Sequence, residues 1–240
     1  MSRFRPLVGF SLFCLALFVV LIGLGVWQLE RLQWKRALIA EMNRNMAQPP
    51  VSLDAALSLG DAAEYRPVAL DGRFDNRLEV YVFATGPQGA PVYHVLTPLR
   101  LDDHRVMLVD RGVVPLALRD PSSRPGSEPV GQIHIVGIWR TADRPGVFTP
   151  APDTSRRIWY ARDVAGIARI EHLTLAAPAI IEASASPHSV AWPKAGQTRV
   201  DLPNDHLQYA ITWFLLAGAL VVIWFAFHRA RGRFGSATEP

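Results

Sequence analysis

Two uncharged apolar stretches, one near each end of this 240-residue chain, constrain its fold most. Residues 7–29 and residues 209–227 contain no Asp, Glu, Lys or Arg. As helices rising about 1.5 Å per residue, they would be roughly 34 and 28 Å long, and a bilayer core is about 30 Å thick. We therefore expect a membrane protein with two transmembrane helices. Helical periodicity extends the first helix to about residue 43.

The distribution of charge predicts how the chain is oriented. The whole net charge of +4 lies in the short tails, residues 1–6 and 228–240, whereas residues 30–208 contain as many basic as acidic residues. Short basic tails stay on the cytoplasmic side of a membrane, so we expect both termini in the cytoplasm and the middle of the chain outside it. A neutral middle also lacks the basic face that nucleic acid requires, which excludes a nucleic-acid-binding domain.

The residue pattern of the segment between the two stretches is typical of a β-rich domain. Short runs rich in Val, Ile, Leu and aromatic residues are separated by Gly, Pro, Asp and Asn, which is typical of strands joined by turns. We expect strands at residues 65–74, 78–84, 92–101, 106–114, 132–139 and 179–183, and helices at 53–59 (capped by Ser52) and 163–173. The prediction is one mostly antiparallel, barrel- or sandwich-like α+β extracytoplasmic domain over residues 30–208, bracketed by the transmembrane helices.

The segment that leads into the second stretch contains a candidate metal ligand, His206. Asn204 or Asp205 is placed to cap a helix whose first turn holds His206, and helical spacing puts Tyr209 and Trp213 on the same face. A helix N-terminus disfavours a positively charged imidazolium, and a neutral imidazole offers a nitrogen lone pair to a metal ion. The alternative is an interfacial histidine in a belt of aromatic residues that binds nothing.

The end of the first stretch carries aromatic and cationic residues at helical spacing. Trp27, Arg31 and Trp34 share one helix face, and Lys35 follows directly. Because the two helices run in opposite directions, we expect this end and His206 to meet at the same membrane surface. An apolar, planar, anionic ligand would suit that meeting point, with Arg31 or Lys35 holding its carboxylates. The alternative is ordinary anchoring of Trp and Arg at the end of a span.

Within the predicted domain no catalytic signature is found. The sequence has no Gly-x-Ser-x-Gly elbow, no P-loop and no Gly-x-Gly-x-x-Gly motif, so we do not expect an enzyme. Two groups of residues are nevertheless candidates for binding a partner: Tyr65, Arg66 and Gly72 in the first group, and Asp110, Arg111 and Gly112 in the second. A structural ion pair at a strand end is the alternative role for the second group.

The motifs taken in order resemble those of the surfeit-locus-one (Surf/Shy) family of cytochrome c oxidase assembly factors. The resemblance lies in residues 25–35, 65–74, 97–99, 109–115, 137–140, 159–163 and 204–214, including Asn204-x-His206-Leu207-x-Tyr209-Ala210. Each motif is weak alone, but the ordered set around one β-rich domain is specific. Val113 departs from the tryptophan that is usual in the family at that place, and Asp205 departs from a common asparagine.

The resemblance implies a role in building haem–copper cytochrome c oxidase, with oxidase subunit I and haem a synthase as candidate partners beside the lipid bilayer. It implies that the protein binds haem a, with His206 as a ligand of the haem iron and Tyr209, Trp213, Trp27, Arg31 and Lys35 around the cofactor. The first residues lack an Arg- and Ser-rich amphipathic presequence, which favours a bacterial inner membrane.

Two other functions are compatible with the residues. The first is a haem-independent scaffold, in which the periplasmic β domain stabilises an oxidase assembly intermediate. The second is a membrane-tethered hydrolase, which the absence of a nucleophile–base signature argues against.

Overall fold

The computed structural model describes residues 6–86, 89–185, 192–196, 198 and 202–233. The chain forms two compact units: Met1–Ala40 together with Asp201–Pro240, which we call the helix pair, and Glu41–Val200, which we call the β domain. Most of the two predicted cytoplasmic tails and part of the segment after residue 185 lie outside the described residues.

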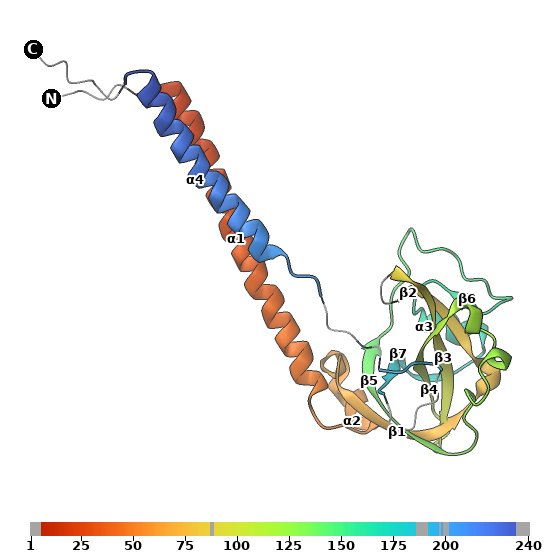
Figure 1. Ribbon diagram of the computed structural model, residues 1–240. Coiled ribbons are helices and arrows are strands. Elements are labelled where there is room, and N and C mark those ends of the chain that lie inside the picture. The colour runs from red at the N-terminus through yellow and green to blue at the C-terminus, as the bar shows by residue number, and fades with distance from the viewer. Residues whose placement is uncertain (1–5, 87–88, 186–191, 197, 199–201, 234–240) are drawn as a thin grey trace, which may run out of the picture. The chain divides into compact units, whose positions relative to one another are not determined.

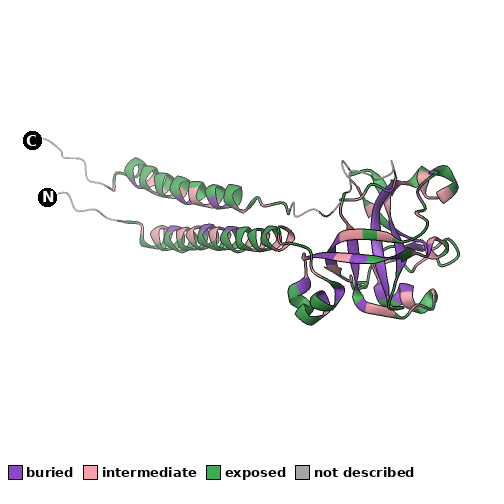
Figure 2. Cartoon of the chain, turned by 90° about the horizontal axis from the view of Figure 1, so that it is seen from below, coloured by how far each residue is buried: buried purple, intermediate pink, exposed green. Residues whose placement is uncertain are grey.

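The helix pair consists of two long apolar helices, α1 (Val8–Met46) and α4 (His206–Ala230), each long and apolar enough to cross a membrane. The predicted helices are therefore present, and α1 continues three residues past the expected position 43. The two helices lie side by side and antiparallel (Figures 1 and 2). Hydrogen bonds join both ends of the pair: the Leu7 N–H donates to His228 Nε2 over 3.2 Å, and Gln28 contacts His206.

Small residues bring the two helices together. Ala210 and Ala217 of α4 are fully buried, and Gly25 of α1 packs against the ring of Phe214. A Cβ atom at Gly25 would lie only 2.5 Å from that ring. Close approach of backbones through small residues is the usual way in which membrane helices pack.

The β domain contains seven strands among the described residues: β1 (Pro67–Phe74), β2 (Val80–Thr85), β3 (Pro91–Leu101), β4 (Val106–Pro115), β5 (Ile133–Thr141), β6 (Ile158–Trp159) and β7 (Leu175–Ala183). Six of them correspond to the predicted strands, and β6 was not predicted. A two-residue strand is too short to show a period of alternation, so nothing in the local sequence marks it.

The sheet closes on itself like a barrel. Its strand order is β1-β5-β7-β4-β3-β2-β6, and β1 also pairs with β3. The sheet closes at Gly72 of β1, which is in register with Ile133 of β5 on one side and with Leu101 of β3 on the other. All pairings are antiparallel except β4–β7 and β2–β6. The prediction of a mostly antiparallel, barrel-like domain between two long apolar helices is therefore confirmed.

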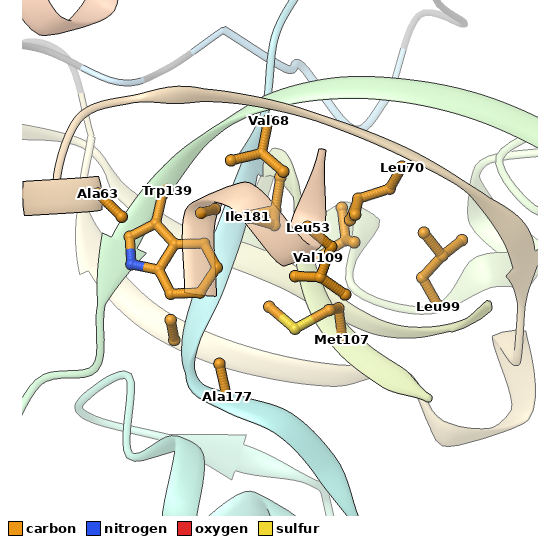
Figure 3. Close-up of a cluster of buried hydrophobic side chains, with 12 residues drawn as sticks. Leu53, Ala63, Val68, Leu70, Leu99, Met107, Val109, Trp139, Ala177 and Ile181 are labelled. Carbon is orange, nitrogen blue, oxygen red and sulfur yellow. The ribbon is translucent and has the colours of Figure 1, made fainter. Parts of the chain in front are cut away.

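Alternating side chains of the strands fill two cores. Met107 and Val109 of β4 point into the first core with Trp139 and Ile181, whereas Leu108 points into the second core on the opposite face. Figure 3 shows the first core, where Leu53 comes in from a short helix to meet the strand residues. This alternation is what a strand with both faces covered produces.

Two short helices cover the sheet. The first, α2 (Leu53–Leu59), has Ser52 as its N-cap, whose side chain accepts a hydrogen bond from the Ala55 N–H as predicted. The second, α3 (Val164–Ile170), is capped by Asp163 and contributes Val164 and Ile167 to the second core. Short 3₁₀ helices occur at Gly60–Ala63, Asn76–Leu78, Leu116–Leu118 and Pro121–Ser123.

Candidate functional site

Several of the predicted site residues lie close together within the helix pair, at the end where α4 begins. His206 is the first residue of α4, and its Nδ1 lies 2.7 Å from Oε1 of Gln28 on α1. Asp205 is the N-cap residue, as one of the two predicted positions, but its side chain makes no capping hydrogen bond. The imidazole is therefore turned toward α1 and held there by an amide group.

Gln28 is a site residue that sequence reasoning missed. Trp27 was chosen for its aromatic ring, yet it is 50% exposed, whereas the neighbouring Gln28 contacts His206. A signal existed: Leu21, Gly25, Gln28 and Leu32 recur at steps of three and four residues. That spacing marks one stripe along a helix, on which Leu21, Gly25 and Leu32 are buried and Gln28 is half-buried.

The aromatic residues predicted around His206 do not all share its face. Trp213 is half-buried, but Tyr209 is 56% exposed. The contact face of α4 runs instead through His206, Ala210 and Ala217, at steps of four and seven residues. Tyr209 lies beside this face, available to anything that approaches the helix pair from the side.

The predicted cations lie at the same end of the helix pair. The Lys35 ammonium donates a hydrogen bond to the carbonyl of Pro203, just before α4. The Arg31 guanidinium lies 4.4 Å from the centre of the Trp34 ring, in a cation–π contact. Because Arg31 and Lys35 are four residues apart on one helix, their side chains are neighbours on its surface. One imidazole and two cations thus share one end of the helix pair.

The second group of predicted residues in the β domain has structural partners. Arg111 is buried and its Nη1 lies 3.3 Å from Oε2 of Glu79, which also binds Arg124 and accepts a 2.8 Å hydrogen bond from the Tyr81 hydroxyl. Burial lowers the pKa of Arg111 to about 10, although Glu79 opposes the shift. Burial, with the neighbouring Glu79, raises the pKa of Tyr81. The guanidinium is enclosed, so it is not available to an external partner.

Asp110 and Gly112 also serve the fold. Oδ2 of Asp110 lies 2.7 Å from His94 Nδ1, and its Oδ1 accepts a hydrogen bond from the Gly112 N–H. Gly112 has a φ of 114°, a conformation that side chains rarely adopt, and it packs against the backbone of Lys194. Burial lowers the pKa of His94, but Asp110 raises it more, so the net shift is upward. Residues 110–112 lie within β4 rather than at a strand end, and Asp110 contacts His94 of β3 instead of Arg111.

The first group lies at the edge where the barrel begins. Tyr65 has a φ of 64° and its ring lies 4.4 Å from the Arg140 guanidinium, which also binds Glu64. Gly72 is where β1 approaches β3 so closely that a Cβ atom would lie 2.5 Å from a backbone oxygen. Nε of Arg66 is buried, and the described part of the chain offers it no hydrogen-bond partner. Arg66 is therefore the residue of this group that has a buried side-chain polar atom without a partner among the described residues.

A chain of ion pairs centred on the buried Glu182 joins β5, β7 and the segment before α3. Glu182 of β7 binds both Arg162 and Arg140, and Arg162 continues to Asp143 over 2.9 Å. Burial raises the pKa of Asp143, but Arg162 lowers it more strongly. In the described ranges no cluster of three or more His, Cys, Asp or Glu side chains is arranged to hold a metal ion.

Comparison with known proteins places these features in one group of sequences. A family model described as the SURF1 family matches residues 15–218, a range that includes Gln28 and His206. "Surfeit locus protein 1" of Mus musculus is 35% identical over 221 residues, which are 85% of this chain and 70% of that protein. The protein of the same name from Homo sapiens is 34% identical over 226 residues, 86% and 73% of the two chains. A "SURF1-like protein" of Drosophila melanogaster is 33% identical over 221 residues, 85% and 72% of the two chains.

Proposed function

The chain belongs to the SURF1 family, and from this premise we propose that it is a non-enzymatic assembly factor for haem–copper cytochrome c oxidase. In this role it binds haem a and assists the insertion of haem a into oxidase subunit I. The observation that carries the proposal is the contact of His206 with Gln28 at the end of the helix pair that also holds two cations. Oxidase subunit I and haem a synthase are the proposed protein partners.

The side chains at this end fit the chemistry of the cofactor. When bound, haem a would supply an iron that takes a nitrogen ligand, together with an apolar ring and two carboxylates. His206 uses Nδ1 in its contact with Gln28, which leaves Nε2 as the nitrogen for the iron. Arg31 and Lys35 complement the carboxylates, and the exposed rings of Trp27 and Tyr209 with half-buried Trp213 offer apolar contact.

The proposed location is the bacterial inner membrane, with both helices of the pair spanning it, both termini in the cytoplasm and the β domain in the periplasm. The support is the length and apolar character of the helices together with the basic residues of the two tails. Alkaline phosphatase fused within residues 119–131 should be active in cells, and an inactive fusion would reverse this orientation.

The haem proposal is tested by replacing the ligand. His206→Ala protein, purified in detergent from a host that produces haem a, should lose most of its Soret absorbance relative to protein. His134→Ala is the matched control, because His134 is an exposed histidine whose contact with Asp71 is on the surface of the β domain. An unchanged spectrum in His206→Ala at equal protein concentration would remove His206 from the site.

One observation favours the scaffold as a second candidate function. Val147 and Phe148 are 97% and 98% exposed, at the centre of a turn that the Thr149 side chain closes with a 2.8 Å hydrogen bond. Two fully exposed apolar side chains on a fixed turn are typical of anchors for a partner surface.

The scaffold is tested on the same turn. In a haem-depleted host, a Val147→Ser, Phe148→Ser double variant should lose co-purified oxidase subunit I. Val130→Ser, which changes a similarly exposed valine elsewhere in the domain, should retain it. If no subunit I co-purifies with the unmodified chain under haem depletion, the scaffold function is excluded.

A further inference from the structure

We infer that Gln28 is a positioning residue: its amide oxygen holds His206 with the ring proton on Nδ1 and so directs the Nε2 lone pair away from α1. The consequence for haem binding rests on the proposed function. The tautomer of His206 does not, because it is a property of the protein without the cofactor.

The contact itself requires this tautomer. Nδ1 of His206 and Oε1 of Gln28 are 2.7 Å apart, a distance typical of a short hydrogen bond. An amide oxygen has lone pairs but no hydrogen, so the proton in the bond belongs to Nδ1. In the neutral ring only one nitrogen carries a proton, and Nε2 is then left with its lone pair.

Packing around Gln28 holds the amide in place. One turn before it, Gly25 contacts the Phe214 ring, and one turn after it, Leu32 is buried. Beyond Leu32, the Lys35 ammonium reaches the Pro203 carbonyl at the entrance to α4. The helices are thus joined on both sides of Gln28 along α1, which holds its side chain next to α4.

His206 is held equally on its own helix. It begins α4, and Ala210, one turn further on, is fully buried against α1. Close packing at Gly25 with Phe214 and at the buried Ala210 lets the longer Gln28 and His206 side chains meet next to it, where α4 begins.

A neutral amide is the suitable partner for this histidine. A metal-binding histidine usually donates the N–H of its other ring nitrogen to a hydrogen-bond acceptor. That acceptor fixes the orientation of the imidazole ring and raises the basicity of the ligating nitrogen, and its loss typically costs 10–100-fold in metal affinity. A carboxylate would accept the same hydrogen bond, but its negative charge would favour the protonated imidazolium, which has no lone pair for a metal ion. Gln28 provides the acceptor without that charge.

The first experiment reads the tautomer directly. We would record ring ¹⁵N chemical shifts of His206 in the full chain, without haem, in detergent micelles at alkaline pH where imidazole rings are neutral. The native protein should show Nδ1 protonated and Nε2 unprotonated. In Gln28→Leu the proton should move to Nε2 in a large share of molecules. Gln33→Leu, an exposed glutamine on the same helix, is the control and should leave the native spectrum unchanged.

Two further variants separate positioning from packing. Gln28→Glu keeps an oxygen at the same reach and should retain the Nδ1–H tautomer. Gln28→Asn is one methylene shorter and should behave as Gln28→Leu does. A native His206 protonated on Nε2, or a Gln28→Leu variant with an unchanged tautomer, would overturn the inference.

The second experiment adds the cofactor. Gln28→Leu should bind haem a 10–100-fold more weakly than the native chain and should shift the iron–histidine stretching frequency, whereas Gln28→Glu should restore binding. If haem a binds equally to all variants and to His206→Ala, the proposed function fails at this site while the tautomer result still decides the role of Gln28. If haem binding depends on His206 but the tautomer does not depend on Gln28, only the present inference fails.

Discussion

The helix pair and the β domain bury opposite kinds of residue. In the helix pair the buried positions are mostly small, such as Gly25, Ala210 and Ala217, whereas Phe13, Leu215 and Val222 are exposed. In the β domain the buried positions lie largely on the strands, and large aliphatic side chains fill the cores there (Figure 2). The comparison supports the proposal that the helix pair lies in a membrane, because many large outward-facing apolar side chains on one element are favourable only where the surroundings are themselves apolar.

The two regions also use buried polar groups differently. The helix pair has few, and they join the helices at its ends: His206 with Gln28 at one end, and His228 near Ser11 and Leu7 at the other. The β domain instead encloses charged residues in networks, of which Glu79 with Arg111 and Arg124 is the most buried. Charges enclosed in a domain core need complete pairing, whereas neutral contacts suffice between apolar helices.

The largest effect should come from breaking a charge network in the β domain. Glu79→Gln leaves the guanidinium groups of Arg111 and Arg124 enclosed without their carboxylate, and we expect a loss of about 3–5 kcal/mol in the free energy of unfolding. The loss is measured by urea unfolding of the full chain in detergent, with the susceptibility of the β domain to proteolysis as the measure of unfolding.

The control for this change is an exposed pair. Asp71→Asn removes a carboxylate that contacts His134 on the surface, and it should cost less than about 1 kcal/mol. Equal losses in the two variants would contradict the view that the domain depends on its enclosed charges.

An intermediate effect is expected from overfilling the helix pair. Gly25→Leu forces the added side chain into the Phe214 ring and should destabilise helix packing by about 1–3 kcal/mol. Spin labels at positions 15 and 221, which line the same groove between the helices, should report a longer and broader distance in a Cys14→Ser background. Gly23→Leu, where an added Cβ meets no atom within 4 Å, should leave the distance unchanged. A distance unaffected by either change would show that small residues do not set the packing.

The smallest effect concerns the pH dependence of the β domain. The pKa of His94 is lowered by burial but raised more by Asp110, with Glu182 adding to the rise and Arg162 opposing it. A folded-state pKa above the unfolded value of about 6.5 means that the stabilisation is fully present below that pH and is lost as pH rises through the folded-state pKa. The loss should be on the order of 1 kcal/mol or less, because the ring is partly exposed.

This pH dependence is measured from urea unfolding of the full chain at a series of pH values between 5 and 9. His94→Gln should be less stable than the native protein at the acidic end and should show a flatter profile. If the stability of the native protein rises with pH through this range, the expected direction of the His94 contribution is wrong.

Much of the fold was predictable because local patterns determine it. Six strands, the Ser52 cap and both long helices follow from alternation, capping chemistry and uninterrupted apolar runs. The unpredicted β6 depends on a parallel pairing with β2, a contact between segments more than seventy residues apart. The closure of the sheet through β1 and β3 is likewise a long-range contact that no local pattern encodes.

The site was predicted unevenly for the same reason. His206, Arg31 and Lys35 were chosen because their chemistry is visible in the residue type, and the structure brings His206 and Lys35 into contact with the opposite segment of the helix pair. Trp27 and Tyr209 were chosen by type as well, yet their exposure shows that they lie beside the contact face. Gln28 was overlooked, because the role of a glutamine depends on its hydrogen-bond partner, which the sequence does not show.

Two apolar helices, a β-rich middle and a histidine at the start of the second helix follow from residue type and spacing along the chain, which are local properties. The enclosure of Arg111 by Glu79 and the contact of His206 with Gln28 become visible only in the folded chain. Burial and hydrogen-bond partnership arise between segments distant in sequence, so they exist only once the chain has folded.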